Sequence, residues 1–316
     1  MTNASNPAAV HLGRSVTHGQ VEAPQDQQAA HNLGRPLRAA HSACLGGLVI
    51  VATVYGLVAG DAYRLVSEMT RQTWRAQDAV TLLFVPVLLW SSRRARAGSL
   101  SGHLLTTGIV LWLAYCYAHL SIGAPLNPIF LVYVAILALA GFAALDGLVR
   151  IDLTAISPAF GRAPWRGAAW LLTVGGIGTG ALWLSEIVGA WPNGLPPNIH
   201  LSQLPNPTWV LDLAWIIPMS LGAALLLWRR RPTGPVVAAV MVVFLLVLSA
   251  SMVSVTPFAW AAGLQTDPAV RTQLIVFTVL FTILGAVAAW LLRVGQRRLG
   301  PVTSSLLHSG WWSAVR

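Results

Sequence analysis

Residues 210–231 read VLDLAWIIPMSLGAALLLWRRR, and this stretch decides the fold. Asp212 stands near its start, a long apolar run follows, and three arginines close it. About 20 apolar residues are what an α-helix needs to cross the hydrocarbon core of a bilayer. Arginines directly after such a run are typical of the cytoplasmic end of a membrane span. The stretch therefore predicts a transmembrane helix with Asp212 near its outer end.

Seven further apolar segments have a comparable pattern. Of the 316 residues, 55% are hydrophobic and only 9% are charged, whereas roughly a quarter of the residues of a soluble domain are charged. The predicted fold is all-α, a polytopic transmembrane helical bundle of about eight spans. We expect the spans at residues 42–60, 79–90, 104–122, 128–149, 168–190, 208–228, 235–255 and 274–292.

The arginines orient these spans. With eight spans, 16 of the 20 arginines fall on the side of the two termini, and only Arg64, Arg71, Arg75 and Arg271 fall on the other side. Because basic residues collect on the cytoplasmic side, we predict a protein of the bacterial cytoplasmic (inner) membrane with both termini in the cytoplasm. We expect residues 1–41 to be a disordered tail, residues 42–298 to be the transmembrane domain, and residues 299–316 to be a cytoplasmic tail. The outer connections are predicted at residues 62–77 and at the proline-rich residues 191–207.

The composition also excludes several classes of function. The chain has no lysine, so neither a retinal Schiff base nor a P-loop lysine can form. The net charge of +10 comes from arginines beside apolar runs rather than from a basic surface patch, so we expect the lipid bilayer, and not nucleic acid, as the partner. The sequence leaves open whether the chain forms a homo- or hetero-oligomer.

The two halves of the chain share an order of features. Span two starts after Asp78, has a proline about two turns later and ends in Leu-Trp before arginines, and span six repeats this order from Asp212. Two such halves of four helices, entering from the same side, would form a 4+4 parallel internal repeat. The alternative is that leucine-rich spans flanked by arginines resemble each other without any repeat.

The candidate site is a group of acidic and histidine side chains near the outer ends of the central spans. Ionisable groups at membrane depth are unfavourable and are usually functional. If spans one, two, five and six pack together, we expect these groups to converge on an outward-facing polar pocket, with Glu68 in the loop beside it. The alternative is structural, because an acid that opens a helix stabilises its free N–H groups. The candidate ligand-binding residues are Asp212, Glu186, Asp78, Asp61, His119 and His200.

Three functions fit this pattern. The favoured one is binding or transport of a cation or a small polar solute through the acidic pocket. The second is an accessory or assembly subunit of a membrane complex, and the third is a membrane-embedded enzyme acting on a lipid or lipid-linked substrate. The chain has no HExxH motif and no closely spaced His/Cys pair, so we assign no metal, no cofactor and no catalytic residue, and an enzyme is less favoured than a non-enzyme.

Two stretches carry a resemblance. AQDAVTLLFVPVLLWSSRRARAGSL, from Ala76, and YAHLSIGAPLNPIFLVYVAILAL, from Tyr117, resemble a group of uncharacterised bacterial multi-span membrane proteins. The resemblance covers spans two to four, with a looser match at VLDLAW and LLLWRRRP. It implies a multi-span topology and no known activity.

Overall fold

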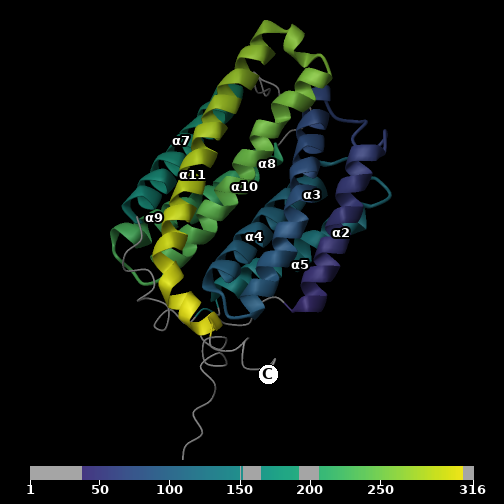
Figure 1. Ribbon diagram of the computed structural model, residues 1–316. Coiled ribbons are helices and arrows are strands. Elements are labelled where there is room, and N and C mark those ends of the chain that lie inside the picture. Colours follow the sequence, from purple (N-terminus) through teal and green to yellow (C-terminus); the bar gives the residue numbers. More distant parts are fainter. Residues whose placement is uncertain (1–37, 150, 152–164, 192–205, 309–316) are drawn as a thin grey trace, which may run out of the picture.

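The chain folds into long antiparallel helices joined mostly by short connections (Figure 1). The computed structural model describes residues 38–149, 151, 165–191 and 206–308. The helices are α2 (Ala39–Val58), α3 (Glu68–Arg96), α4 (Leu100–Gly123), α5 (Phe130–Val149), α7 (Trp165–Ala190), α8 (Pro207–Leu211), the π-helical turn η1 (Asp212–Ile216), α9 (Ile217–Trp228), α10 (Gly234–Ala261), the short 3₁₀ turn η2 (Leu264–Thr266) and α11 (Pro268–His308).

Local sequence explains where these helices begin. The hydroxyl of Ser67 accepts a hydrogen bond from the N–H of Thr70 at 3.2 Å, and the side-chain oxygen of Asn206 accepts one from the N–H of Thr208 at 2.9 Å. Such caps satisfy N–H groups that have no partner within the helix. Pro207 follows Asn206 at the first helical position, where a missing N–H costs nothing.

Seven helical segments of the described residues are long and apolar enough to cross a membrane, with α8, η1 and α9 counted as one. The chain is therefore a helical membrane protein, as predicted. The remaining long helix, α3, carries a polar first third before its apolar stretch. That third is buried against the bundle at Gln72, Trp74 and Gln77, which is why the helix starts at Glu68 and not near the predicted residue 79.

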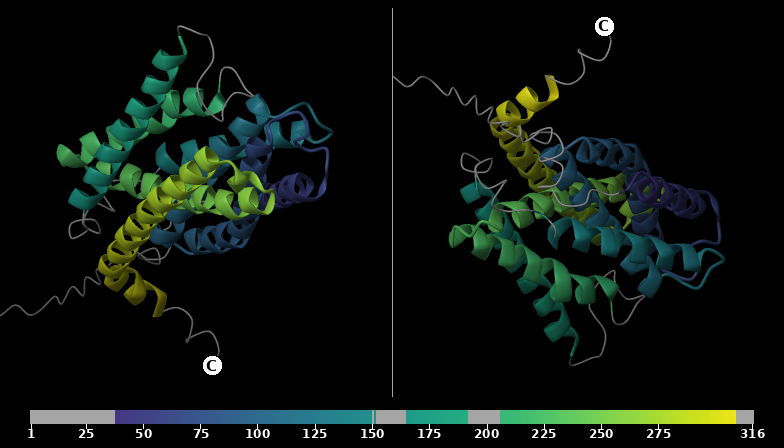
Figure 2. Two further views of the ribbon diagram at one scale, coloured as in Figure 1. Left: turned by 90° about the horizontal axis from the view of Figure 1, so that it is seen from above. Right: turned by 90° about the horizontal axis from the view of Figure 1, so that it is seen from below.

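Two helices form the centre of the bundle. In the most apolar 18-residue stretch of each helix, 78% is buried in α4 and 61% in α10, whereas only 22% is buried in α7 and 17% in α11. One group of helices packs in the order α2, α3, α4, α5, and a second packs in the order α7, α9, α10, α11. Contacts of α10 with α3 and α4 join the two groups (Figures 1 and 2).

Some predicted boundaries move or cannot be compared. Helix α2 begins at Ala39 and α11 continues to His308, so helical structure extends beyond both ends of the predicted domain at residues 42–298. Residues 1–37, most of the predicted N-terminal tail, and residues 192–205, most of the predicted proline-rich connection, lie outside the described residues.

Candidate functional site

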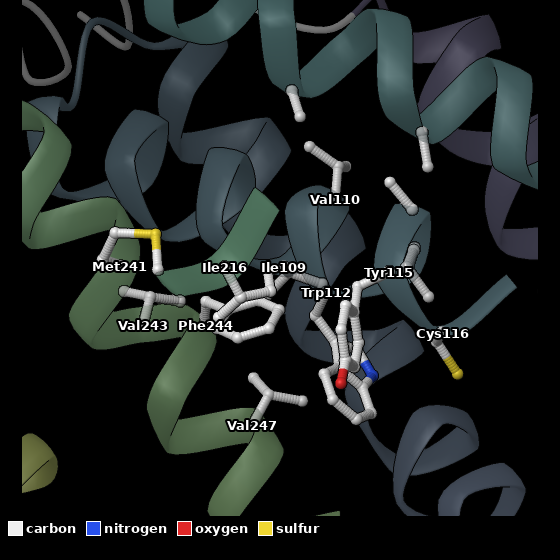
Figure 3. Close-up of a cluster of buried hydrophobic side chains, with 14 of the residues drawn as sticks. Ile109, Val110, Trp112, Tyr115, Cys116, Ile216, Met241, Val243, Phe244 and Val247 are labelled. Atoms are coloured by element: carbon white, nitrogen blue, oxygen red, sulfur yellow. The ribbon is translucent and has the colours of Figure 1, made fainter. Parts of the chain in front are cut away.

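The C-terminal half of α4 carries the side chains around which the candidate site is built. Tyr115, Cys116 and Tyr117 are consecutive and all buried, and His119 follows half a turn later. Consecutive helical residues point in directions about 100° apart. Figure 3 shows Tyr115 beside Trp112 and Phe244, while Cys116 points away from these rings. Helix α4 therefore presents polar groups to two different neighbours.

Asp212 lies on the first of these two sides. It is the first residue of η1, five residues beyond the start of α8, and its side chain is 8% exposed. The hydroxyl of Tyr115 donates to one carboxylate oxygen at 2.8 Å, and the indole N–H of Trp183 donates to the other at 2.8 Å. Two helices, α4 and α7, thus fix the carboxylate with neutral donors.

The wide turn at Asp212 has a local cause. Pro218 has no N–H and its ring crowds the carbonyl four residues earlier, so a regular α-helix is disturbed in the preceding turn. The chain responds with the π-helical segment Asp212–Ile216 and returns to α-helix at Ile217. Such π turns inside α-helices occur frequently at functional sites.

Glu186 and His119 lie around the same helix junction. The indole N–H of Trp209, one turn before Asp212, donates to Glu186 at 3.3 Å. A ring nitrogen of His119 is 2.9 Å from the hydroxyl of Thr208, and the His119 ring packs edge-on against the ring of Tyr115 with 4.6 Å between centroids. The structure therefore brings Asp212, Glu186 and His119 into one region between α4, α7 and α8, which we call the Asp212 site.

Asp78 belongs to a separate group. Its side chain is 1% exposed and accepts a hydrogen bond from the hydroxyl of Tyr63 at 2.8 Å. The sequence-based alternative that Asp78 opens a helix is wrong, because α3 is capped by Ser67 and Asp78 lies ten residues inside it. Asp212 also does not open its helix, since Asn206 caps α8. The ordinary helix-capping explanation therefore fails for both acids.

The other candidates take no part in either group. Asp61 is exposed in the connection after α2. Glu68 forms an exposed ion pair with Arg71 at 2.9 Å, an arrangement of little energetic weight. His200 lies outside the described residues. Asp78 and Asp212 thus have different hydrogen-bond partners, and no hydrogen bond or ion pair of the described residues joins the two acids directly.

Electrostatics distinguish the two buried acids. No described basic side chain forms an ion pair with Asp212, whereas the Arg75 guanidinium acts on Asp78 from one turn earlier in α3. Burial and the negative charge of Asp78 raise the pKa of Tyr63, which lies outside the spans, well above its ordinary value of 10. Tyr63 is therefore a neutral donor to Asp78. Within the described residues, no three His, Cys, Asp or Glu side chains are grouped closely enough to hold a metal ion.

Sequence reasoning missed the aromatic residues that hold the acids. Tyr115, Trp183 and Tyr63 were not among the candidate site residues. Each pairing joins residues between 15 and 97 positions apart, so a short sequence pattern cannot predict it. The one local signal was Pro218, which predicts a disturbed helix around Asp212.

Comparisons with known proteins add no family. No protein-family model matches the chain, and no curated protein or solved structure is significantly similar to it. The resemblance of spans two to four to multi-span bacterial proteins stays a prediction.

Proposed function

We propose that the chain binds or transports a small cation, with a small organic ammonium ion as the favoured class, at the Asp212 site. The observation that carries the proposal is a buried carboxylate held by Tyr115 and Trp183 without an ion pair among the described residues. Neutral donors orient a carboxylate and leave its negative charge uncompensated. An uncompensated charge in a membrane interior is unfavourable unless a cation or a proton joins it.

The surroundings of Asp212 fit an organic cation better than a bare metal ion. Glu186 supplies a second carboxylate to this region. It is connected to the helix that carries Asp212 because the indole N–H of Trp209 donates to it. The rings of Tyr115, Trp183 and Trp209 supply aromatic faces, which attract ammonium groups by cation–π interaction. The helix at this point is interrupted by the π turn, and interrupted helices form the substrate sites of many transporters.

The transport proposal includes a topology. The eight long helices of the described residues place the start of α2 and the end of α11 at the same end of the bundle (Figure 1). We place this end in the cytoplasm of a bacterial cell, because most arginines flank it. The parallel packing orders of α2–α5 and of α7–α11 support a 4+4 repeat in which Asp78 and Asp212 are equivalent.

An accessory subunit is the competing proposal, and a helix face of small residues free to dock a partner helix would support it. Gly176 and Gly180 of α7 pack against Leu221 and Ile217 of α9 within the same chain. This face is therefore used inside the chain, and it does not support docking of a partner helix. The enzyme alternative has no additional support from the site.

Ligand-dependent stability tests the proposal. Purified wild-type protein is titrated with tetramethylammonium and, separately, with sodium, each at constant ionic strength, and thermal unfolding is followed. A ligand at 100 times its dissociation constant stabilises the folded state by about 2.7 kcal/mol. We expect tetramethylammonium to raise the midpoint for the wild type and to have no effect on Asp212→Asn.

The matched control is Asp267→Asn, which removes one exposed outer carboxylate at the start of α11 and leaves the site intact. Its response must equal that of the wild type. Equal stabilisation of wild type and Asp212→Asn would refute a cation site at Asp212. A response to sodium alone, lost in Asp212→Asn, would keep the site and replace the organic ammonium ion by an inorganic cation.

A further inference from the structure

A second buried acid lies on the other side of α4. Asp78 is 15 residues before Arg93, or about 22 Å along the helix axis at 1.5 Å per residue. Since Arg93 is the first arginine at the inner end of α3, Asp78 lies within the roughly 30 Å of hydrocarbon. A carboxylate at this depth needs a partner that neutralises or stabilises it.

The walls of this group leave little space. Gly56 of α2 packs against the Asp78 carboxylate, and a Cβ at this position would lie 2.6 Å from the Tyr63 hydroxyl. On the α4 side, Cys116 is buried and accepts a hydrogen bond from the amide of Gln77 at 2.6 Å. The group is therefore too tightly enclosed for an organic solute.

One polar group within reach of Asp78 has no partner. The hydroxyl of Tyr117 is completely buried and makes no hydrogen bond with the described residues, although it lies within electrostatic reach of the Asp78 charge. A buried hydroxyl without a partner costs about 1–3 kcal/mol. Its oxygen can accept a hydrogen bond from a protonated carboxyl group, whereas a carboxylate has no hydrogen to donate.

These contacts suit two charge states of Asp78. When Asp78 is ionised, its carboxylate accepts the hydrogen bond from the Tyr63 hydroxyl. When a hydronium ion transfers a proton to the free carboxylate oxygen, the new O–H becomes a donor, and a hydroxyl oxygen such as that of Tyr117 can accept the hydrogen bond. The step breaks one O–H bond of hydronium, forms one O–H bond on the carboxyl group and releases water.

We propose that Asp78 is a reversible proton-binding site inside the membrane domain, with Tyr63 and Tyr117 as its hydrogen-bonding partners in the two charge states. The site is distinct from the Asp212 site and stands whether or not Asp212 binds a cation. If both hold, α4 carries contacts to both sites at Tyr115 and Tyr117, which would make the protein a proton-coupled cation transporter.

Other groups bear on the titration of Asp78. Helix α10, which packs against α3, contributes no titratable side chain, and its Ser254 donates to the carbonyl of Ala76. Among the described residues, four charged or titratable groups face Asp78 directly: Arg75 of α3, Tyr63 of the α2–α3 connection, and Cys116 and Tyr117 of α4. Tyr133 of α5 acts from farther away, and Tyr55 of α2 in turn acts on Tyr133.

Infrared difference spectroscopy tests the site without any solute. Purified full-length protein in lipid nanodiscs is titrated from alkaline to acidic pH, and the carbonyl stretch of protonated carboxyl groups is recorded in H₂O and D₂O. The comparison is made in an Asp212→Asn background, because Asp212 is also buried and its carboxyl group can give a band of its own. We expect a band from a buried carboxyl group in Asp212→Asn and in Asp212→Asn combined with Asp267→Asn. The band should be absent when Asp78→Asn is combined with Asp212→Asn.

A band that persists in the Asp78→Asn/Asp212→Asn double variant, or an Asp212→Asn variant without any pH-dependent buried band, would overturn the proposal. If Asp78→Asn does not fold, Tyr117→Phe and Tyr63→Phe keep the carboxyl group and decide the question. Tyr117→Phe should move the midpoint to lower pH and Tyr63→Phe to higher pH, and unmoved midpoints in both would overturn the proposal. Loss of tetramethylammonium binding with an intact band would count against the cation site alone.

Discussion

Gly56 provides the sharpest test of how the Asp78 group is packed. A Cβ added by Gly56→Ala would lie 2.6 Å from the Tyr63 hydroxyl and 2.9 Å from the carboxyl carbon of Asp78. Both distances are shorter than van der Waals contact allows. The substitution must therefore separate Tyr63 from Asp78 or push α2 away from α3.

The magnitude follows from the hydrogen bond that is lost. A hydrogen bond to a charged group contributes about 1.5–3 kcal/mol, whereas alanine in place of glycine favours a helix by up to about 1 kcal/mol. We expect Gly56→Ala to lower the free energy of unfolding by about 1–2 kcal/mol. The matched control is Gly47→Ala in the same helix, where a Cβ meets nothing within 4 Å, and it should be neutral or slightly stabilising.

The assay is reversible unfolding in mixed micelles, measured for both glycine variants alone and combined with Tyr63→Phe. Because Tyr63→Phe removes the hydroxyl that the new methyl group meets, the effect of Gly56→Ala should shrink by at least about 0.5 kcal/mol in that background. Equal stability of Gly56→Ala and Gly47→Ala, or strict additivity with Tyr63→Phe, would refute this packing argument.

Three further predictions rest on described contacts. Gly176→Ala should lower the free energy of unfolding by about 1–3 kcal/mol, because its Cβ would lie 2.9 Å from Leu221. Gly175→Ala is the control, since its Cβ faces open space and should not change the stability. Equal effects of the two substitutions on unfolding in mixed micelles would contradict the α7–α9 contact. Ser67→Ala should destabilise the start of α3 by about 0.5–2 kcal/mol, seen as faster hydrogen exchange at the Thr70 amide, and Ser67→Asn should restore protection. The raised pKa of Tyr63 means that the unfolded chain loses this proton first as the pH rises above about 10. The wild type should then lose stability relative to Tyr63→Phe with increasing pH, and a constant difference between them would show that Tyr63 is not buried.

Much of the fold could be predicted because membrane insertion depends on local composition. Runs of about 20 apolar residues need a helix in hydrocarbon, since no other structure satisfies their backbone groups. The predicted span at residues 128–149 and the helix Phe130–Val149 accordingly agree closely. The prediction was poorest for α3, whose polar residues 68–77 form a helix only because the neighbouring helices bury them.

The candidate site was predictable only in part. The sequence alone identified Asp212, Glu186 and Asp78 as unusual, because an acid beside or inside an apolar run is unfavourable wherever it lies. It could not show that Tyr115 and Trp183 hold Asp212, or that Tyr63 holds Asp78, since these pairs depend on which helices pack together.

The sequence by itself determined the helices, their approximate ends and the arginine asymmetry, because each depends on the composition of one short segment. Only the tertiary structure decided that Asp78 and Asp212 occupy different sides of α4 and use different partners. The physical reason is that a helix fixes the direction of each side chain relative to its own axis, whereas its rotation about that axis is set by packing against its neighbours.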